Sequence, residues 1–391
     1  MTQSSGKRRL GATQIRMGLP IKWALFGPNG NLLLREGAIV EAEHQVESLM
    51  RAGAYYYTGP NLTEYNPLAP DVAPVSVYEL VCSLIQRLAS AYECVALGES
   101  LDATPAKFAA QIEALVLDIQ AFSHECPGAV LGSTQMIMHA PSHLVHALHC
   151  AMVCEIAASK LAWPPQERVP LVAAALTQNI ALVELQKTLD SQEGPLTEEQ
   201  RLQVREHPRS GVKLLHQLGV DDRLWLSTVF QHHERLDGSG YPRGLQGKEI
   251  IREARLLAIV DSYVAMTRPR AYRQTLRSRD AIKELFKQRG QAIDSRLSDL
   301  FLMAVGLFAP GSLIRRLRGE VAVVYAISPH PEKLVVSTIT DTRSHSLEKP
   351  APPVVIDITE VSGVLNLTDY EKLVAHMGQI WPDPLSLQEL I

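Results

Sequence analysis

Apolar residues recur at every third or fourth position over most of the chain from Val75 to about Phe308. This spacing places apolar side chains on one face of a helix and predicts a long run of α-helices. Two segments, SHLVHALHCAMVCEIAASKLAW and RVPLVAAALTQNIALVELQKTL, are apolar on more than one face, which predicts helices buried in a core. Thr197 with Gln200 three residues later predicts a helix start closed by a capping box.

The two ends of the chain show a different pattern. Near the N-terminus, two short apolar runs flank the turn PNGN at 28–31, which is typical of a β-hairpin, and the following segment EAEHQVESLMRAGAYYY has roughly helical spacing. A polar, proline-rich stretch from Pro60 to Pro74 predicts a linker. After Gly311, short runs rich in β-branched residues predict strands, and TDYEKLVAHMG predicts a last helix.

Together these patterns predict a mainly α fold with a small β-containing module at each end. A chain of 391 residues is long enough for several domains. We expect four parts, which are an N-terminal β-plus-helix module with its linker at 1–74, a helical connector at 75–134, a helical domain at 135–308 and a C-terminal β-rich module at 309–391.

The composition narrows the classes of function. Apolar residues make up 46% of the chain and the net charge is −4 without a basic block, so a nucleic acid is not an expected partner. No stretch of about 18 residues is both apolar and free of charges, so no membrane span is expected. The five cysteines, an odd number without a CxxC pair, predict free thiols in the cytoplasm. Cys150 and Cys154 are expected to be packing residues.

The residues that suggest chemistry are histidines and one aspartate. His232 and His233 are adjacent and precede a glycine-rich turn, and two imidazoles suit a divalent metal. Neighbouring helix residues point about 100° apart, however, so one buried and one exposed histidine is the alternative. Asp261 lies alone in an apolar helix, where a carboxylate is costly unless it binds a metal, caps the helix or pairs with an arginine such as Arg255.

The stretch HHERLDGSGYPRGL resembles the HHExxDGxGYP signature of the HD-GYP family. Members of this family are bacterial metal-dependent phosphodiesterases that hydrolyse cyclic di-GMP. Two further segments, LTEEQRLQVREHPRSGVKLL and EIIREARLLAIVDSYVAMTRPRAYR, are similar to the family's sequence on either side of that signature. The resemblance covers about residues 135–305 and implies an HD-type helical bundle as the core of the fold.

The resemblance also implies which residues would bind metal and nucleotide. The metal ligands that it implies are His146, His207, His232, His233 and Asp261. The nucleotide-binding residues that it implies are Gly238, Gly240, Tyr241 and Pro242 in the turn, with Arg270 and Arg273 at the positions that meet the phosphates.

The chain departs from the family at its defining His-Asp dyad. Where the family has AALLHDIGK, this chain has AAALTQNIAL, so Gln178 and Asn179 replace the dyad, and Leu182 replaces the lysine that contacts the scissile phosphate. Ser142 and Val264 replace two further acidic residues. Because amides are poor ligands for transition metals, we expect one Fe, Mn or Zn ion, or none, rather than a bridged pair.

The altered dyad and the extra histidines lead to two further expectations. Gln178 and Asn179 are near-isosteric polar substitutes, and we expect them to hydrogen-bond to the remaining histidines. His143, His146 and His149 share one helix face, so a metal site shifted towards them is an alternative to the family's site.

Three functions are consistent with these patterns. The first is a degenerate, catalytically impaired HD-GYP signalling protein that binds cyclic di-GMP or a partner protein such as a GGDEF-type cyclase. The alternative is an active metal-dependent phosphodiesterase that hydrolyses cyclic di-GMP through a reduced metal site. The third is a structural adaptor with an inert helical core. In each case we expect a cytoplasmic protein, and its exposed helical surface is compatible with a homodimer.

Overall fold

The structure is a computed structural model that describes residues 76–96, 105–137, 140–190, 192, 194–268, 275–367 and 377–381. Of the N-terminal part it describes residues 6–10, 15, 25–26, 32–34, 46, 49–50 and 55–58. The chain divides into two compact units, one of Met1–Ser83 with Pro382–Ile391 and one of Leu84–Trp381. The division into four parts expected from the sequence stays a prediction.

The N-terminal unit contains a small antiparallel sheet. Its strands are β1 (Gly6–Arg9), β2 (Leu25–Phe26), β3 (Leu32–Leu34) and β4 (Tyr55–Thr58), in the order β1-β4-β2-β3. The predicted hairpin around PNGN is confirmed, because β2 and β3 pair across that turn. The three tyrosines at the end of the segment with helical spacing form β4 instead, since β1 pairs with them and aromatic residues favour strands. The predicted linker lies outside the described residues.

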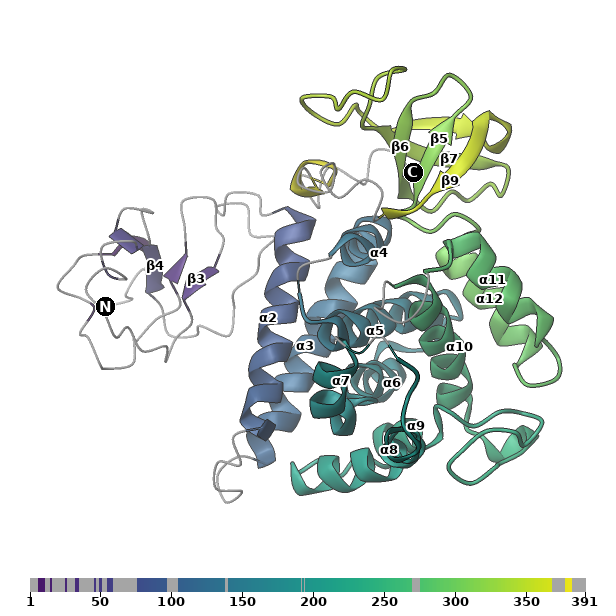
Figure 1. The fold of residues 1–391 in the computed structure, drawn as a ribbon. Helices are drawn as coiled ribbons and strands as arrows, with labels where there is room; N and C mark the ends of the chain where they lie inside the picture. The colour runs from purple at the N-terminus through teal and green to yellow at the C-terminus, as the bar shows by residue number, and fades with distance from the viewer. Residues whose placement is uncertain are drawn as a thin grey trace. The chain divides into compact units, whose positions relative to one another are not determined.

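Helices make up most of the second unit, as the apolar spacing predicts (Figure 1). The helices, one of which begins in the first unit, are α2 (Val77–Ala96), α3 (Pro105–Glu125), α4 (Pro127–Met136), α5 (Ser142–Lys160), α6 (Pro165–Thr177), η3 (Ile180–Leu182), α7 (Val183–Leu189), α8 (Glu198–Gln217), α9 (Arg223–Gln231), η4 (Gly247–Glu249), α10 (Arg252–Thr267), α11 (Ser278–Lys287) and α12 (Ser295–Val305). The predicted capping box is present, because Thr197 accepts the backbone N–H of Gln200 at the start of α8.

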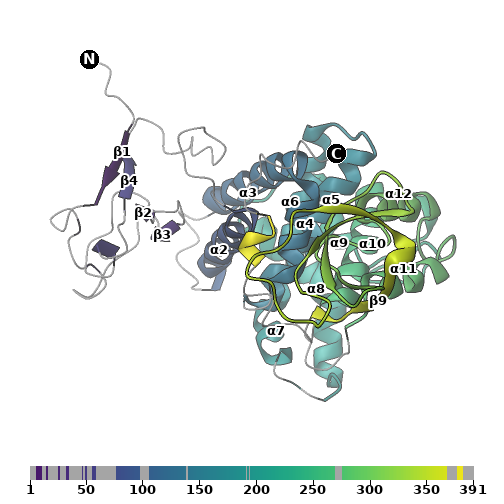
Figure 2. The ribbon, with the colours of Figure 1, turned by 90° about the horizontal axis from the view of Figure 1, so that it is seen from above.

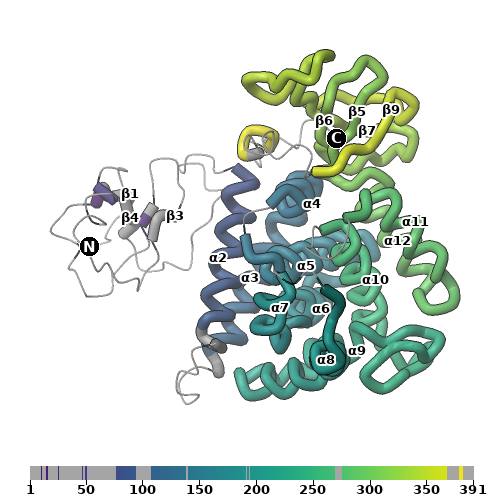
Figure 3. Tube along the Cα trace, viewed as in Figure 1, coloured from purple at the N-terminus to yellow at the C-terminus, as the bar shows by residue number. Residues whose placement is uncertain are grey.

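Helix α5 is the centre of this helical part. It packs against α3, α4, α6, α10 and α12, and the tube view shows it among these neighbours (Figure 3). All of its residues from Leu144 to Ala158 are buried, because the segment is apolar on every face. The polar residues within this buried stretch, His146, His149 and Glu155, are therefore held inside the bundle.

The segment Pro165–Leu189, which spans α6, η3 and α7, is long and apolar enough to cross a membrane by length and composition alone. Half of its most apolar window is buried inside the structure, and Leu171–Leu176 of α6 are fully buried there. A core helix of a helical bundle has the same composition, so the segment is a weak indication of a span. The sequence expectation of no membrane span stays a prediction.

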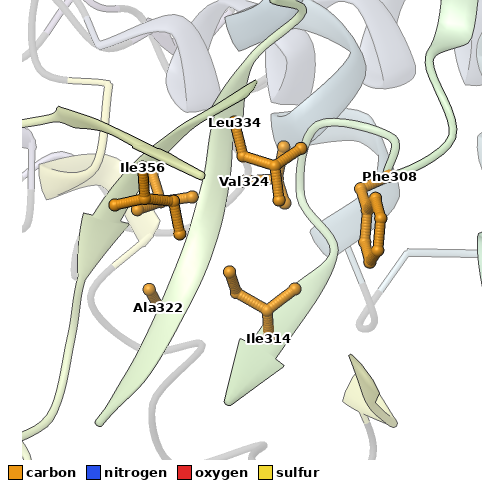
Figure 4. Packing of buried hydrophobic residues seen from close by; sticks show 7 residues of the cluster. Phe308, Ile314, Ala322, Val324, Leu334 and Ile356 are labelled. Atoms are coloured by element: carbon orange, nitrogen blue, oxygen red, sulfur yellow. The ribbon is translucent and has the colours of Figure 1, made fainter. Parts of the chain in front are cut away.

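A five-stranded antiparallel sheet follows the helices and confirms the predicted C-terminal strands. Its core is a cluster of apolar side chains that includes Phe308, Ile314, Val324 and Ile356 (Figure 4). The strands are β5 (Leu313–Arg316), β6 (Val321–Ala326), β7 (Lys333–Thr338), β8 (Val354–Asp357) and β9 (Val361–Leu365), in the order β8-β7-β6-β5-β9. The predicted last helix lies largely outside the described residues.

Strand β6 of this sheet packs against helix α4 (Figure 1). Seen from above, the C-terminal sheet, in which β9 is labelled, lies in front of helices of the same unit (Figure 2). Trp381 is fully buried in this region, where its indole N–H donates to the carbonyl of Tyr325 at 3.0 Å. A Cβ at Gly132 would lie 2.4 Å from the Trp381 ring, and one at Gly128 would lie 2.8 Å from the Cα of Ala326. Glycine on α4 is therefore required for the sheet and the indole to approach the helix.

We predict that Gly132→Ala destabilises the second unit. The added methyl overlaps the Trp381 ring, and overpacking of this kind costs about 1–3 kcal/mol, more than the helix propensity that alanine adds. Urea denaturation followed by tryptophan fluorescence measures the change. Gly194→Ala is the control, since nothing lies within 4 Å of its Cβ position. Equal unfolding midpoints for the two variants would contradict the close packing.

Candidate metal centre

Helix α9 ends at the paired histidines and thereby brings both into one site. Its last residue is Gln231, and His232 is the C-cap, so the chain leaves the helix between the two imidazoles. Their ring centroids lie 4.1 Å apart, and the ring of His207 on α8 lies 5.1 Å and 5.0 Å from them. The 100° separation expected for a continuous helix does not apply here, and three imidazoles from two helices form one cluster.

The hydrogen bonds of His207 and His232 determine which ring nitrogens carry protons. Each Nδ1 lies 2.6 Å from a backbone carbonyl, that of Val204 for His207 and that of Val229 for His232. Since a carbonyl only accepts, both Nδ1 atoms are donors, and in the neutral rings both Nε2 atoms carry bare lone pairs. These two Nε2 atoms face each other at 3.2 Å.

A proton shared between these nitrogens would relieve the repulsion of the lone pairs, but the site disfavours it. Burial and the neighbouring imidazole lower the pKa of His207 to about 3, and burial also lowers the pKa of His232. A metal cation satisfies both lone pairs at once, and backbone carbonyls commonly orient metal-bound histidines in this way. The residues present therefore fit a metal ion.

A second set of possible ligands consists of His146 and Cys150 on α5 and Asp261 on α10. The Nε2 of His146 lies 2.9 Å from a carboxylate oxygen of Asp261 and 3.5 Å from the sulfur of Cys150. Burial alone would raise the pKa of Asp261, but the hydrogen bond from His146 and the nearby imidazoles hold that pKa below its usual range. The alternative pairing with Arg255 is wrong, because Arg255 pairs with Asp294 at 3.3 Å.

The two sets lie close enough to influence each other electrostatically. The negative charge of Asp261 raises the pKa values of His207, His232 and His233, although burial outweighs that effect for each of them. Each set has its ligand atoms within 4.8 Å of one another. The five metal ligands implied by the sequence are thus brought together by α5, α8, α10 and the end of α9.

The turn after the histidines closes one side of the centre. Gly238 has φ +80°, and a Cβ at Gly240 would come 2.4 Å from the backbone nitrogen of Arg235, so both positions require glycine. The peptide bond between Tyr241 and Pro242 is cis. The ring of Tyr241 stacks on His233 with centroids 4.6 Å apart, so this part of the turn contacts the imidazoles directly.

Glu234 holds the same turn from inside. Its side chain is buried, and its two carboxylate oxygens accept the backbone N–H groups of Arg243 at 2.7 Å and Leu245 at 2.9 Å. The glutamate of the signature therefore shapes the loop and leaves metal binding to the histidines beside it.

Comparisons with known proteins agree with this geometry. The HD domain family matches residues 133–297. The cyclic di-GMP phosphodiesterase PA4108 of Pseudomonas aeruginosa is 26% identical over 331 residues, which cover 81% of this chain and 77% of that protein. Residues 133–297 therefore belong to the HD domain family, and the matches support the resemblance to its HD-GYP members.

Two further relatives match over shorter stretches of the chain. The cyclic di-GMP phosphodiesterase response regulator RpfG of Xanthomonas campestris is 32% identical over 38% of this chain and 40% of its own length. The cyclic di-GMP phosphodiesterase PdeB of Borreliella burgdorferi is 25% identical over 42% of this chain and 43% of its own length. A solved structure of Bd1817, an HDG"Y"P protein from Bdellovibrio bacteriovorus, covers 76% of this chain and 98% of its own at 15% identity and a TM-score of 0.49.

Gln178, at the first position of the HD-GYP dyad, is fully buried at the end of α6, and neither atom of its side-chain amide has a hydrogen-bond partner. The expectation that Gln178 bonds to the remaining histidines is therefore wrong. The histidines take backbone carbonyls as partners instead, which satisfies their Nδ1 atoms without the amide. A buried, unpaired amide costs about 1–3 kcal/mol, so Gln178 is destabilising at this position.

Asn179 and Leu182, the other two altered positions, line a pocket beside His146. The remaining residues that line it are Ser142, His143, Gln186 and Arg268. Ser142 hydrogen-bonds to the exposed carboxylate of Asp190 at 2.7 Å, so the acidic position of the family is replaced here by a hydroxyl that is already engaged.

Two further expectations from the sequence concern a metal site shifted towards His143 and His149 and the two nucleotide-binding arginines. His143 stacks against Tyr92 with centroids 6.3 Å apart, and His149 is buried but belongs to neither set of ligands, so the described residues give the shifted site no support. Arg270 and Arg273 lie outside the described residues.

Sequence reasoning missed three residues of the centre. Cys150 was expected to be a packing residue, although it recurs one turn after His146. The positive charge of Arg235 lowers the pKa of His232, and the guanidinium of Arg205 lies 5.8 Å from the Tyr241 ring. No spacing rule identifies the two arginines, because they approach the centre only after the loop has folded.

We predict that acid destabilises the metal-free protein. Burial lowers the pKa values of His149 and His207 from 6.5 to about 3, so the unfolded chain takes up protons that the folded one does not. The free energy of unfolding should fall as the pH drops from about 6.5 to about 3, by up to about 1.4 kcal/mol per pH unit for each histidine. Urea titrations across this pH range measure the free energy of unfolding. In His149→Asn the dependence of this free energy on pH should be weaker by the contribution of one histidine.

We also predict that removing the metal lowers the unfolding temperature. A metal present at 100 times its Kd stabilises the folded state by about 2.7 kcal/mol. EDTA should therefore shift the melting curve of the wild type, while His207→Ala should melt at one temperature with or without EDTA. The control is His216→Ala on the same helix, whose side chain is 71% exposed. An equal EDTA shift in both variants would exclude His207 as a ligand.

Proposed function

We propose that the chain is a metal-dependent phosphodiesterase that hydrolyses a cyclic dinucleotide, cyclic di-GMP in the first place, through a reduced metal site. The observation that carries this proposal is the pair of bare Nε2 lone pairs of His207 and His232, 3.2 Å apart and beside the carboxylate of Asp261. The three similar proteins described above are named cyclic di-GMP phosphodiesterases, and two others are named 3′3′-cGAMP-specific phosphodiesterases, so the names support a cyclic dinucleotide as the substrate class.

Different residues of the centre would have different roles in such a reaction. A bound divalent metal supplies Lewis acidity, which activates a water molecule and offsets charge on the phosphate. The imidazoles of His207, His232 and His233 bind that ion as neutral ligands, and Asp261 supplies one negative charge. Arg235 and Arg205 provide positive charge near Tyr241, where a phosphate of the substrate can be held.

A second candidate function is nucleotide binding without hydrolysis. The observation that favours it is the replacement of the dyad by Gln178 and Asn179, which removes a carboxylate, and of the lysine by Leu182. The turn and the histidine cluster would then bind a nucleotide or a GGDEF-type cyclase without turnover. The cytoplasmic location, the homodimer and the adaptor function stay predictions.

The first test compares hydrolysis and metal content in Asp261→Asn. The protein is loaded with Mn²⁺, Fe²⁺ or Zn²⁺ without oxygen, and the products from cyclic di-GMP and from 3′3′-cGAMP are separated by chromatography. Loss of the carboxylate should lower both metal affinity and turnover by about 100-fold or more. The control is Asp341→Asn, whose carboxylate pairs with His345 in the C-terminal sheet module. Binding of nucleotide by metal-loaded wild type with no product would favour the second candidate.

Restoring the dyad gives a complementary prediction. The double substitution Gln178→His and Asn179→Asp adds an imidazole and a carboxylate beside the existing ligands, so metal content should rise towards two ions per chain. Turnover of cyclic di-GMP should rise by about 10- to 100-fold. Elemental analysis and the same product assay measure both. Unchanged metal content in a folded double variant would mean that this position does not reach the centre.

A further inference from the structure

Cys150 occupies a position that packing alone does not explain. It lies on α5 one helical turn after His146 and is fully buried. Its sulfur is 3.5 Å from the Nε2 of His146, the same ring nitrogen that lies 2.9 Å from Asp261. A thiol, an imidazole and a carboxylate therefore converge on one point, with all three ligand atoms within 4.8 Å of one another.

The distances suit a metal with mixed sulfur, nitrogen and oxygen ligands. In a tetrahedral zinc site with bonds of about 2.0–2.3 Å, neighbouring ligand atoms lie about 3.3–3.6 Å apart. The sulfur-to-nitrogen distance of 3.5 Å already falls in this range, and the nitrogen-to-oxygen distance of 2.9 Å needs only a small opening. The other ring nitrogen of His146 is also buried and has no hydrogen-bond partner, so the local protein groups leave this imidazole incompletely satisfied.

Charge provides a second argument for a sulfur ligand. Asp261 is the only carboxylate in the two sets of ligands, and the histidines are neutral ligands. One negative charge leaves a divalent ion in a buried site with a net positive charge, which a second anionic ligand would offset. A thiolate at Cys150 would supply the second negative charge, and the family's dyad carboxylate is an amide here, at Asn179.

We propose that Cys150 is a thiolate ligand of the metal centre and forms, with His146 and Asp261, a position that takes Zn²⁺ or Fe²⁺ in preference to Mn²⁺ or Mg²⁺. The inference rests on the proposed metal-dependent function. On binding, the S–H bond of Cys150 breaks and its proton passes to solvent, the proton of His146 moves from Nε2 to Nδ1, and bonds from the sulfur and from Nε2 to the metal form, without oxidation or reduction. Soft sulfur ligands favour zinc and iron over the harder cations.

Cys154 provides a matched comparison within the same helix. It lies one turn after Cys150 and is equally buried, but it belongs to neither set of ligands. Burial raises the pKa of the Cys154 thiol well above its usual value, so this sulfur stays protonated. The two cysteines are thus equally buried on the same helix, and they differ in that the sulfur of Cys150 lies 3.5 Å from the Nε2 of His146.

The test is spectroscopic and uses the full chain loaded with Co²⁺ without oxygen. A thiolate bound to Co²⁺ gives an intense sulfur-to-metal charge-transfer band in the near ultraviolet, which imidazole and carboxylate ligands do not give. The wild type and Cys154→Ser should show this band, and Cys150→Ser should lose it. The affinity of Cys150→Ser for Zn²⁺ should fall by about 100-fold or more. Circular dichroism of each variant shows whether it is folded.

X-ray absorption of the zinc-loaded wild type does not depend on any variant. We expect a sulfur neighbour at about 2.3 Å beside nitrogen and oxygen neighbours at about 2.0–2.1 Å. Zinc or cobalt bound by nitrogen and oxygen alone, a band that persists in Cys150→Ser, or no metal binding at all would each overturn the inference. A cobalt–thiolate band in a protein that does not hydrolyse cyclic dinucleotides would support Cys150 as a ligand and count against the proposed activity.

Discussion

Two imidazole nitrogens that face each other at 3.2 Å are the constraint on which the centre depends. Their lone pairs repel unless a cation lies between them, and the backbone carbonyls of Val204 and Val229 prevent the rings from turning away. Helix α8 carries one ring and the end of α9 carries the other, so the packing of these two helices sets the distance. The protein therefore holds its ligands in place before a metal binds and gives up some stability to do so.

The buried helix α5 brings a second set of polar groups into the same interior. A helix that is apolar on every face goes to the centre of the bundle, and His146 and Cys150 go with it. Asp261 meets them from α10, which packs against α5. Each of these groups would be costly alone in such a place, and their meeting reduces that cost. The packing of α5 against α10 therefore forms the core and also brings these polar side chains together.

The altered dyad changes the charge of the centre more than its shape. Gln178 and Asn179 keep the size of the family's residues and give up a carboxylate and an imidazole. The HD-GYP architecture is retained around them, from the α9 histidines to the glycine-rich turn. The unpaired amide of Gln178 is a local conflict, and conflicts of this kind are expected at functional sites. The number of negatively charged ligands that are left sets which metal ions the centre can hold.

The sequence by itself determined the helices, the hairpin around PNGN, the C-terminal strands and the capping box at Thr197, because these depend on apolar spacing or on turn and cap residues close in sequence. The resemblance to the HD-GYP family also pointed to the five residues expected to bind metal. Only the tertiary structure decided that both adjacent histidines face one site, since that depends on where α9 ends against α8. The tertiary structure also decided that Asp261 pairs with His146 and that Cys150 lies beside this pair, because α5 and α10 are far apart in the chain. It likewise left the side chain of Gln178 without a hydrogen-bond partner, which no sequence pattern shows.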